Sequence, residues 1–217
     1  MGLRHRYRVA ALILLGLTVG IATTACATQY TYVADSGDNA YFKVPPSWHQ
    51  VSQSSLQSVE GPSNNVGSYL WSRAYDASST PSVKDIFSST TVPVVYAAVL
   101  SLSSSERSQV SYNTMRDLLL PVTSSARSAA QQAGEDLTGF QSIADQVISN
   151  SKGYRGIREV FTYTVGVTSE VFDLTVLTDS ATTKMYFLLV QCAAQSFNTN
   201  YPQISQVVNS FTVGGGS

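Results

Sequence analysis

Histidine, cysteine and charge are scarce in this 217-residue sequence, which has two histidines, two cysteines and 12% charged residues. Two cysteines cannot build the multiple-disulfide framework of a small secreted domain. A histidine-based metal site needs more imidazoles than His5 and His49 provide, and no nucleophilic-serine or phosphate-loop motif is present. We therefore expect no catalytic residue, no cofactor and no metal.

Positive charge is also scarce. The whole sequence has a net charge of −1, and without Arg4, Arg6 and Arg8 the remaining 10 basic and 14 acidic residues give about −4. No basic patch with interleaved aromatic residues is present, so nucleic-acid binding is not expected.

The first residues have the layout of a secretory signal peptide. Arg4, Arg6 and Arg8 precede a predominantly apolar run over residues 9–21, and small residues follow at 22–25. The apolar run is too short to cross a bilayer as a helix. Residues 1–25 are therefore predicted to be a signal peptide.

Cys26 follows this segment directly, and the region resembles a bacterial lipoprotein signal. Ala25 matches that pattern, whereas Thr23 departs from the usual leucine. Acylation of Cys26, with chains such as palmitate, would anchor the protein to the extracytoplasmic face of the cell membrane, because each buried methylene contributes about 0.8 kcal/mol. The alternative is cleavage after Ala27, which would release a soluble, secreted protein.

The C-terminal third contains the clearest pattern. Residues 155–165 and 171–178 alternate as half-buried strands, with a turn expected at 168–170. The apolar faces comprise Ile157, Phe161, Tyr163 and Val165 in the first strand and Phe172, Leu174 and Val176 in the second. The run at 184–194 is almost wholly apolar, which is typical of a central strand covered on both faces.

A helix is predicted over residues 198–209, because apolar residues then recur every three or four positions. Asn198 or Asn200 could cap this helix, and Pro202 fits its first turn. Its apolar stripe needs a partner, so a helix packed on an antiparallel sheet follows. A short closing strand is expected at 211–213.

Further strands are expected at residues 40–44, 68–75 and 92–102, whereas the pattern at 140–149 fits either a strand or a helix. Thr80 and Pro81 indicate a short helix to residue 88. Ser103 and Glu106 form a capping-box pattern for a helix reaching residue 120. The weak periodicity of the segment 123–137 fits a helix, a mobile loop or both.

Paired carboxylates could support a hydrolase. Glu135, Asp136, Asp173 and Asp179 are the candidates, although any domain with 14 acidic residues offers such pairs. A glycosidase-like pair needs two of them about 5–10 Å apart in one cleft.

Other residues admit a binding role or a structural one. Aromatic residues could line a ligand groove or belong to the core: Trp48, Tyr69, Trp71 and Tyr75. His49 is expected to be a partly exposed loop residue, with a catalytic base as the alternative, and Cys192 to be a small buried hydrophobic residue. Arg155 and Arg158 are expected on a solvated face or in cross-strand ion pairs.

The motif at residues 41–48, YFKVPPSW, resembles the opening of PsbP/Mog1-like domains, including small bacterial lipoproteins of actinobacterial type. The residues at 153–156, 184–187 and 210–211 are similar as well. This resemblance covers most of residues 30–213. It implies an α+β fold in which helices sandwich an antiparallel sheet (α/β/α), and it implies no activity. The segment 105–137 is longer than a simple link and reads as an insertion.

These observations predict four regions: a signal peptide (1–25), a lipidated N-terminus and tether (26–36), a single α+β domain (37–213) and a flexible tail (214–217). We expect a non-enzymatic cell-surface lipoprotein that binds an envelope protein or a small ligand, at residues that the sequence does not identify. A carboxylate-based envelope hydrolase and a soluble, secreted binding domain are the alternatives.

Overall fold

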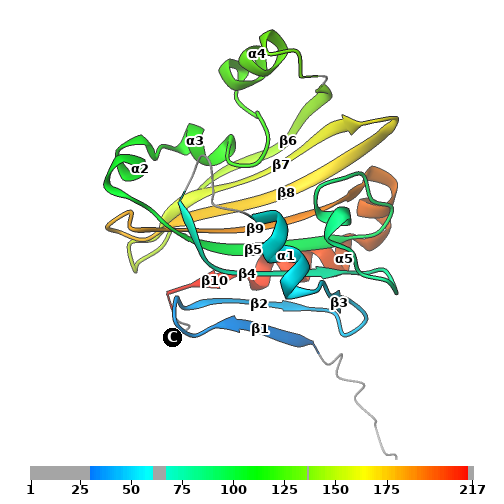
Figure 1. Ribbon diagram of the computed structural model, residues 1–217, viewed down its shortest axis with the longest axis horizontal. Helices are drawn as coiled ribbons and strands as arrows, with labels where there is room; N and C mark the ends of the chain where they lie inside the picture. The colour runs from blue at the N-terminus through cyan, green and yellow to red at the C-terminus, as the bar shows by residue number, and fades with distance from the viewer. Residues whose placement is uncertain (1–29, 61–66, 136, 215–217) are drawn as a thin grey trace, which may run out of the picture.

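The computed structural model describes residues 30–60, 67–135 and 137–214, and its largest element is a seven-stranded antiparallel sheet (Figure 1). The strand order is β3-β4-β5-β9-β8-β7-β6. The bounds are His49–Gln50 (β3), Ser68–Asp76 (β4), Val94–Ser101 (β5), Thr138–Ser149 (β6), Arg155–Val165 (β7), Thr168–Thr178 (β8) and Lys184–Ala193 (β9). β9 lies at the centre and is buried along most of its length, as its apolar run predicts. The predicted antiparallel α+β class is confirmed.

A second, three-stranded sheet has the order β1-β2-β10. It consists of Thr31–Asp35 (β1), Ala40–Val44 (β2) and Thr212–Val213 (β10). The predicted tether at 26–36 is wrong where it overlaps β1, because β1 pairs with β2 along its whole length. Cys26, the signal peptide and residues 215–217 of the predicted tail lie outside the described residues.

Side chains of the main sheet alternate between two faces, because a strand's side-chain period is two. One face packs on Leu56 of α1 (Gln53–Glu60) and on Met115 of α3 (Tyr112–Arg116), and we call it the α1 face. The other packs on α5 (Ala194–Ser210) and on β2, and we call it the α5 face. Figure 1 shows α1 in front of the sheet and α5 behind it. Helices therefore lie on both faces, as the resemblance implies.

The predicted helix 198–209 begins earlier than expected, at Ala194. The chain passes from β9 straight into α5, and Ala193 occupies the cap position without a side-chain hydrogen bond. The proposed caps at Asn198 and Asn200 are therefore wrong, and Pro202 lies inside the helix. The predicted apolar stripe does face the sheet, since Phe197, Ile204, Val207 and Val208 are buried.

Short helices cover the α1 face and its margin: α1, η1 (a 3-10 helix, Val83–Ile86), α2 (Ser104–Gln109), α3 and α4 (Ser124–Gln132). The sequence did not predict α1. The helix expected at 80–88 is reduced to η1, and its cap is Ser82 instead of Thr80. The capping box of Ser103 and Glu106 is confirmed.

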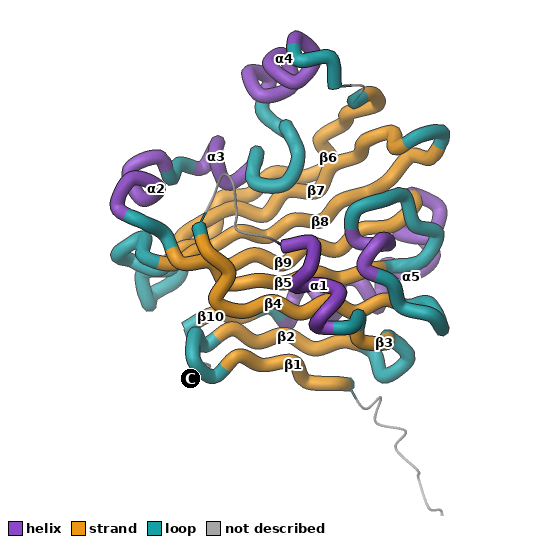
Figure 2. The backbone as a smooth tube through the Cα atoms, in the orientation of Figure 1, coloured by secondary structure: helices purple, strands orange, loops and turns teal. Residues whose placement is uncertain are grey.

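The helix expected at 103–120 divides in two near Val110, because a second capping box, Ser111 with Thr114, starts α3. The segment 123–137, for which helix and loop were both possible, begins with α4, and Thr123 caps this helix. Figure 2 shows α4 beyond the β6 edge of the sheet rather than over its face.

The β7–β8 hairpin turns at Gly166 and Val167, and not at the expected residues 168–170. Thr168 already pairs with Val165. Gly166 has a φ of 64°, a left-handed conformation that tight hairpin turns require and that glycine adopts without steric cost. The turn is therefore shorter than its polar residues suggested.

Among the residues that the structure describes, no helix combines the length and apolar character needed to cross a membrane.

Candidate functional site

β7 and β8 line two pockets, one on each face of the main sheet. On the α5 face, the residues Val160, Thr162, Val171 and Asp173 line the first pocket. The residues that alternate with them, Phe161, Tyr163, Phe172 and Leu174, line the second pocket on the α1 face. Successive side chains of a strand point to opposite faces of the sheet, so the alternation predicted from the sequence places the two pockets on opposite faces.

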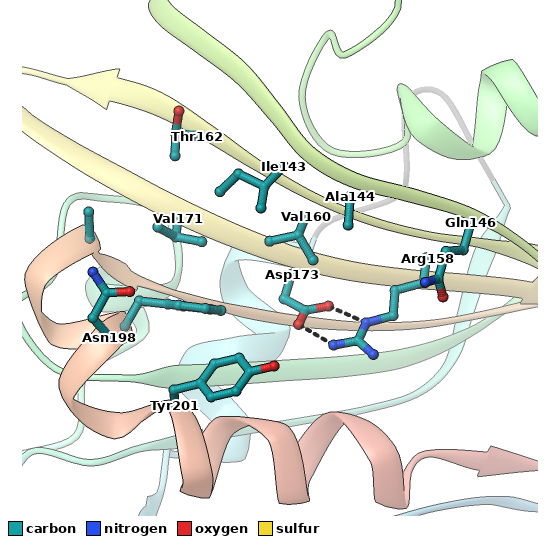
Figure 3. Close-up of a pocket in the computed structure, with 12 residues that line it drawn as sticks. Ile143, Ala144, Gln146, Arg158, Val160, Thr162, Val171, Asp173, Asn198 and Tyr201 are labelled. Atoms are coloured by element: carbon teal, nitrogen blue, oxygen red, sulfur yellow. Dashed lines mark hydrogen bonds and ion pairs between the residues drawn. The ribbon is translucent and has the colours of Figure 1, made fainter.

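The first, called the α5 pocket, encloses about 490 Å³ between the sheet and the N-terminal half of α5 (Figure 3). Its polar and aromatic lining comes from β6, β7, β8 and α5. The residues that matter most below are Gln146, Arg158, Asp173, Phe197, Asn198 and Tyr201.

Arg158 and Asp173 form an ion pair in this pocket. Arg158 Nε donates to Oδ1 at 2.9 Å and Nη2 donates to Oδ2 at 2.7 Å, which is the bidentate geometry of strong arginine–carboxylate pairs. The Asp173 side chain is only 2% exposed, and that of Arg158 is 26% exposed. The hydrogen bonding with Asp173 raises the pKa of Arg158 above its ordinary value. The expectation of a cross-strand ion pair is confirmed for Arg158.

Two aromatic rings of α5 lie beside this pair. Phe197 is buried and Tyr201 is 55% exposed, with their ring centroids 6.1 Å apart. Figure 3 shows Tyr201 pointing from α5 toward the ion pair. Within the described residues, the Tyr201 hydroxyl and the side-chain amides of Gln146 and Asn198 make no hydrogen bond to the protein. These groups are available to a ligand.

The second pocket, called the apolar cavity, encloses about 330 Å³ on the α1 face. Its floor is the sheet, with Phe161 and Phe172 stacked at a centroid distance of 5.2 Å. Its walls come from the η1 region and from two parts of the predicted insertion, namely Ile86, Phe87, Leu119, Leu120 and Leu137. Both volumes fall within the range of about 300–1,000 Å³ typical of ligand sites.

Polar groups on the wall of the apolar cavity are engaged with the protein itself. Tyr163 donates its hydroxyl hydrogen bond to the carbonyl oxygen of Pro121. Gln191 Nε2 donates to the carbonyl oxygens of Asp85 and Ser88, at 3.0 and 3.2 Å. These bonds fix the walls and leave an aliphatic and aromatic interior.

The carboxylates predicted from the sequence do not converge. Asp173 is paired with Arg158, and Asp179 accepts hydrogen bonds from Thr183 at the turn before β9. Glu135 lines a separate hollow beside α4, and Asp136 lies outside the described residues. The described candidates therefore do not form a pair in one cleft.

The four aromatic residues, which could line a groove or belong to the core, are divided: Tyr69 and Trp71 line a pocket between α1 and β4, and the other two are buried. Trp48 and Tyr75 are core residues. A β-bulge at Leu70 shifts the register between Tyr69 and Trp71, so that Tyr69 packs on the α1-face cluster while Trp71 packs on the α5-face clusters. The four rings therefore do not share one ligand surface.

The remaining single residues follow their predictions in part, with differences at His49 and Arg155. His49 is exposed, although in the two-residue strand β3 instead of a loop. Cys192 is a buried free cysteine, and burial raises the pKa of its thiol to about 12. Arg155 donates to Thr182 Oγ1 at 3.0 Å rather than pairing with a carboxylate.

Sequence reasoning missed two groups of carboxylates. Burial raises the pKa of Asp85, and so does a side-chain hydrogen bond with Asp76. Neither of them lines the α5 pocket or the apolar cavity. Glu159 is 3% exposed on β7, and burial followed by the nearby Asp145 raises its pKa to about 7. Arg116 Nε lies 3.7 Å from Glu159. The members of each group come from different elements of the fold, so no local motif marks them.

Across residues 30–60, 67–135 and 137–214, no three or more His, Cys, Asp and Glu side chains are grouped so as to hold a metal ion.

No protein-family model matches this sequence, and no curated protein matches it. Solved structures similar to the chain include three named proteins. The cyanobacterial PsbP of Synechocystis is 14% identical with a TM-score of 0.49, covering 90% of this chain and 99% of that one. The Ran-binding protein Mog1p of Saccharomyces cerevisiae is 9% identical with a TM-score of 0.44, covering 86% and 96%.

The third is LpqN, involved in cell envelope biogenesis of Mycobacterium tuberculosis, which is 13% identical with a TM-score of 0.48 and covers 86% and 91%. Proteins of the PsbP/Mog1-like group are thus among the structures to which this chain is similar. The likeness is one of fold alone, and no residue role is carried over from it.

Proposed function

We propose that this chain is a non-enzymatic, lipid-anchored protein of the cell envelope that binds a small ligand with an apolar body in the apolar cavity. The observation that carries the proposal is the cavity itself, a space of about 330 Å³ with an aliphatic and aromatic lining. Such a site gains free energy by removing apolar ligand surface from water, at about 25 cal/mol per Å².

The composition of the wall supports an apolar ligand over a polar one. Tyr163 and Gln191 already donate their hydrogen bonds to backbone carbonyls of the protein. A polar ligand entering the cavity would lose its bonds to water without replacing them, which is costly. An alkyl or ring portion has no such bonds to lose.

Two exposed apolar residues support an opening to solvent. Phe87 is 60% exposed and Leu119 is 37% exposed, and both also line the cavity. They belong to two separate segments: Phe87 follows η1, and Leu119 lies between α3 and α4 within the predicted insertion. Their side chains extend the apolar lining of the cavity to the surface.

The anchor and the absence of catalysis remain proposals from the sequence. Cys26 follows an apolar segment of signal-peptide type. Serine is plentiful, but no nucleophile-elbow motif is present, and His49 is the only histidine in the sequence outside the predicted signal peptide. The separation of Asp173 from Glu135 also supports a binding role. Turnover in a hydrolase panel that a single substitution abolishes would contradict the non-enzymatic assignment.

Native and denatured mass spectrometry of the full-length protein, purified from its own host, tests both parts. We expect a denatured mass that includes acyl chains on Cys26, and a native adduct that is lost on denaturation. A mature N-terminus at Thr28 without lipid would instead favour the secreted form. A native mass without any adduct, together with no uptake of a fluorescent fatty acid, would contradict the ligand proposal.

A substitution at the opening locates the ligand. Leu119→Trp is expected to abolish the adduct, because a larger side chain occupies the entrance. Leu70→Trp is the matched control, since Leu70 is similarly exposed, at 49%, but does not line the cavity. Equal loss in both variants, or in neither, would argue against this cavity as the binding site.

A further inference from the structure

The α5 pocket differs from the apolar cavity in its chemistry, and it carries a second inference. Of the residues lining it, only Arg158 and Asp173 are charged, and they neutralise each other through a bidentate pair. A pocket of this kind offers hydrogen-bonding groups without a net charge. An anionic ligand would have to compete with Asp173 for the guanidinium, which makes an anion a poor occupant.

We propose that the α5 pocket binds a neutral pyranose sugar. A pyranose presents hydroxyl groups around its rim and an apolar C–H face, so it needs donors, acceptors and an exposed ring in one place. The α5 pocket combines these with enough room, about 490 Å³.

The exposed ring is Tyr201. It is 55% exposed, although its neighbour Phe197 is 7% exposed and belongs to the core. Burial of an aromatic ring is favourable, so a tyrosine left open beside a pocket is suited to receive the C–H face of a sugar. Figure 3 shows the ring of Tyr201 below the Arg158–Asp173 pair, on the same side of the pocket as Asn198.

The hydroxyl-binding groups lie on both sides of this ring. Gln146 on β6 and Asn198 on α5 each offer an amide, which both donates and accepts. In the part of the chain that the structure describes, neither amide is bonded to the protein, and Arg158 Nη1 is also unbonded. Asp173 uses its two oxygens to hold Arg158, so the guanidinium is oriented before a ligand arrives.

This proposal is independent of the ligand in the apolar cavity, because the sheet separates the two sites. Asp173 and Phe172 point to opposite faces of β8. Loss of one ligand with retention of the other would therefore identify which proposal fails.

Saturation-transfer NMR on the purified full chain, in a zwitterionic detergent without a sugar headgroup, tests the inference. The probes are D-glucose, D-galactose and D-mannose, with D-glucuronate as the charged counterpart of D-glucose. We expect transfer to at least one neutral sugar and weaker transfer to D-glucuronate. Absence of transfer to all three neutral sugars at millimolar concentrations, or stronger transfer to D-glucuronate, would overturn it.

A trisaccharide built from the sugar that binds, such as maltotriose for D-glucose, distinguishes the source of the sugar. Transfer concentrated on one terminal ring would support recognition of a glycan end. Transfer to the monosaccharides with none to the trisaccharide would support a free sugar, because a longer chain would then be sterically excluded. Equal transfer to all three rings would contradict a single-pyranose pocket.

Substitutions of single residues test whether the sugar binds in the α5 pocket. Tyr201→Ala is expected to weaken binding about two- to tenfold, which is the range for one aromatic contact. Gln146→Ala should weaken it as well, and both side chains are exposed, so the fold is retained. Tyr32→Ala is the control, since Tyr32 is 80% exposed on β1 and lies outside the pocket. Unchanged affinity in Tyr201→Ala and Gln146→Ala would rule out this site.

Discussion

Phe172 and Asp173 are adjacent on β8, and their side chains line different pockets on opposite faces of the main sheet. Phe172 stacks on Phe161 in the floor of the apolar cavity. Asp173 holds Arg158 in the α5 pocket. A single strand thus gives one face an apolar site and the other a polar one, through the alternation that any strand imposes.

The Arg158–Asp173 pair can be tested as a stability element. Arg158→Met leaves the Asp173 carboxylate, which is 2% exposed, without its partner. We expect a loss of about 3 kcal/mol in the free energy of unfolding, because an unpaired buried charge is costly. Urea denaturation measures it. The double variant Arg158→Met with Asp173→Leu should recover most of the loss, since no buried charge remains. A loss below about 0.5 kcal/mol in the single variant, the size of an ordinary surface substitution, would show that the pair is effectively solvated.

Tyr163 is predicted to fix the wall of the apolar cavity through its hydrogen bond to the Pro121 carbonyl. Tyr163→Phe removes this bond and leaves a part-buried carbonyl unpaired, at an expected cost of about 1–2 kcal/mol. Hydrogen exchange should accelerate at residues 117–123 more than elsewhere. Tyr112→Phe is the control, because Tyr112 is 39% exposed and its ring lies outside this cavity. Uniform acceleration across the chain would contradict a local role.

Local patterns predicted most elements of the fold but not their ends, and they missed α1. The alternation of Phe161 and Thr162 is a property of the strand alone, so it could be read directly. The start of α5 could not, because Ala193 passes from β9 into the helix without a capping side chain. The bulge at Leu70 is a shift in the pairing register between β4 and β5, and no residue type in β4 predicts it.

The candidate sites needed the register and the tertiary arrangement. The sequence marks Asp173 as a candidate for a carboxylate pair, but its actual partner, Arg158, follows from the pairing of β7 with β8. The α5 pocket joins β6 to α5, as Gln146 and Asn198 illustrate. The apolar cavity needs Leu119, from a segment expected to be an insertion. Residues that come together from separate elements in this way have no fixed spacing in the sequence, so no motif predicts them.

Gly156 is predicted to be required for close packing of β7 against β8. A Cβ added at this residue would lie 1.8 Å from the carbonyl oxygen of Val176 and 2.8 Å from the Cα of Leu177. Backbone atoms cannot move aside cheaply, so Gly156→Ala should cost at least about 3 kcal/mol, the upper end for overpacking. Gly37→Ala is the control, because its nearest neighbour would be Asp35 Oδ1 at 3.5 Å. Thermal unfolding measures both, and similar midpoints would contradict the prediction.

Glu159 is predicted to make stability depend on pH. Its carboxyl group is 3% exposed, and burial together with Asp145 and Asp117 raises its pKa from the ordinary 4.5 to about 7, while Arg116 and Arg127 act in the opposite direction. In the folded protein this group therefore holds its proton up to a higher pH than in the unfolded chain. The stability must fall as the pH rises from about 4.5 to about 7 and is level above that.

Glu159→Gln removes this titration while keeping the size and the polarity of the side chain. We expect the variant and the parent to be similar near pH 4.5, and the variant to be more stable by up to about 3 kcal/mol at pH 8, since each pKa unit corresponds to about 1.4 kcal/mol. Urea denaturation across this pH range gives the difference directly. Glu135→Gln serves as the control, because Glu135 is exposed. If the curves of the Glu159 variant and the parent ran parallel from pH 4.5 to pH 8, then Arg116 would stabilise the ionised carboxylate enough to offset its burial.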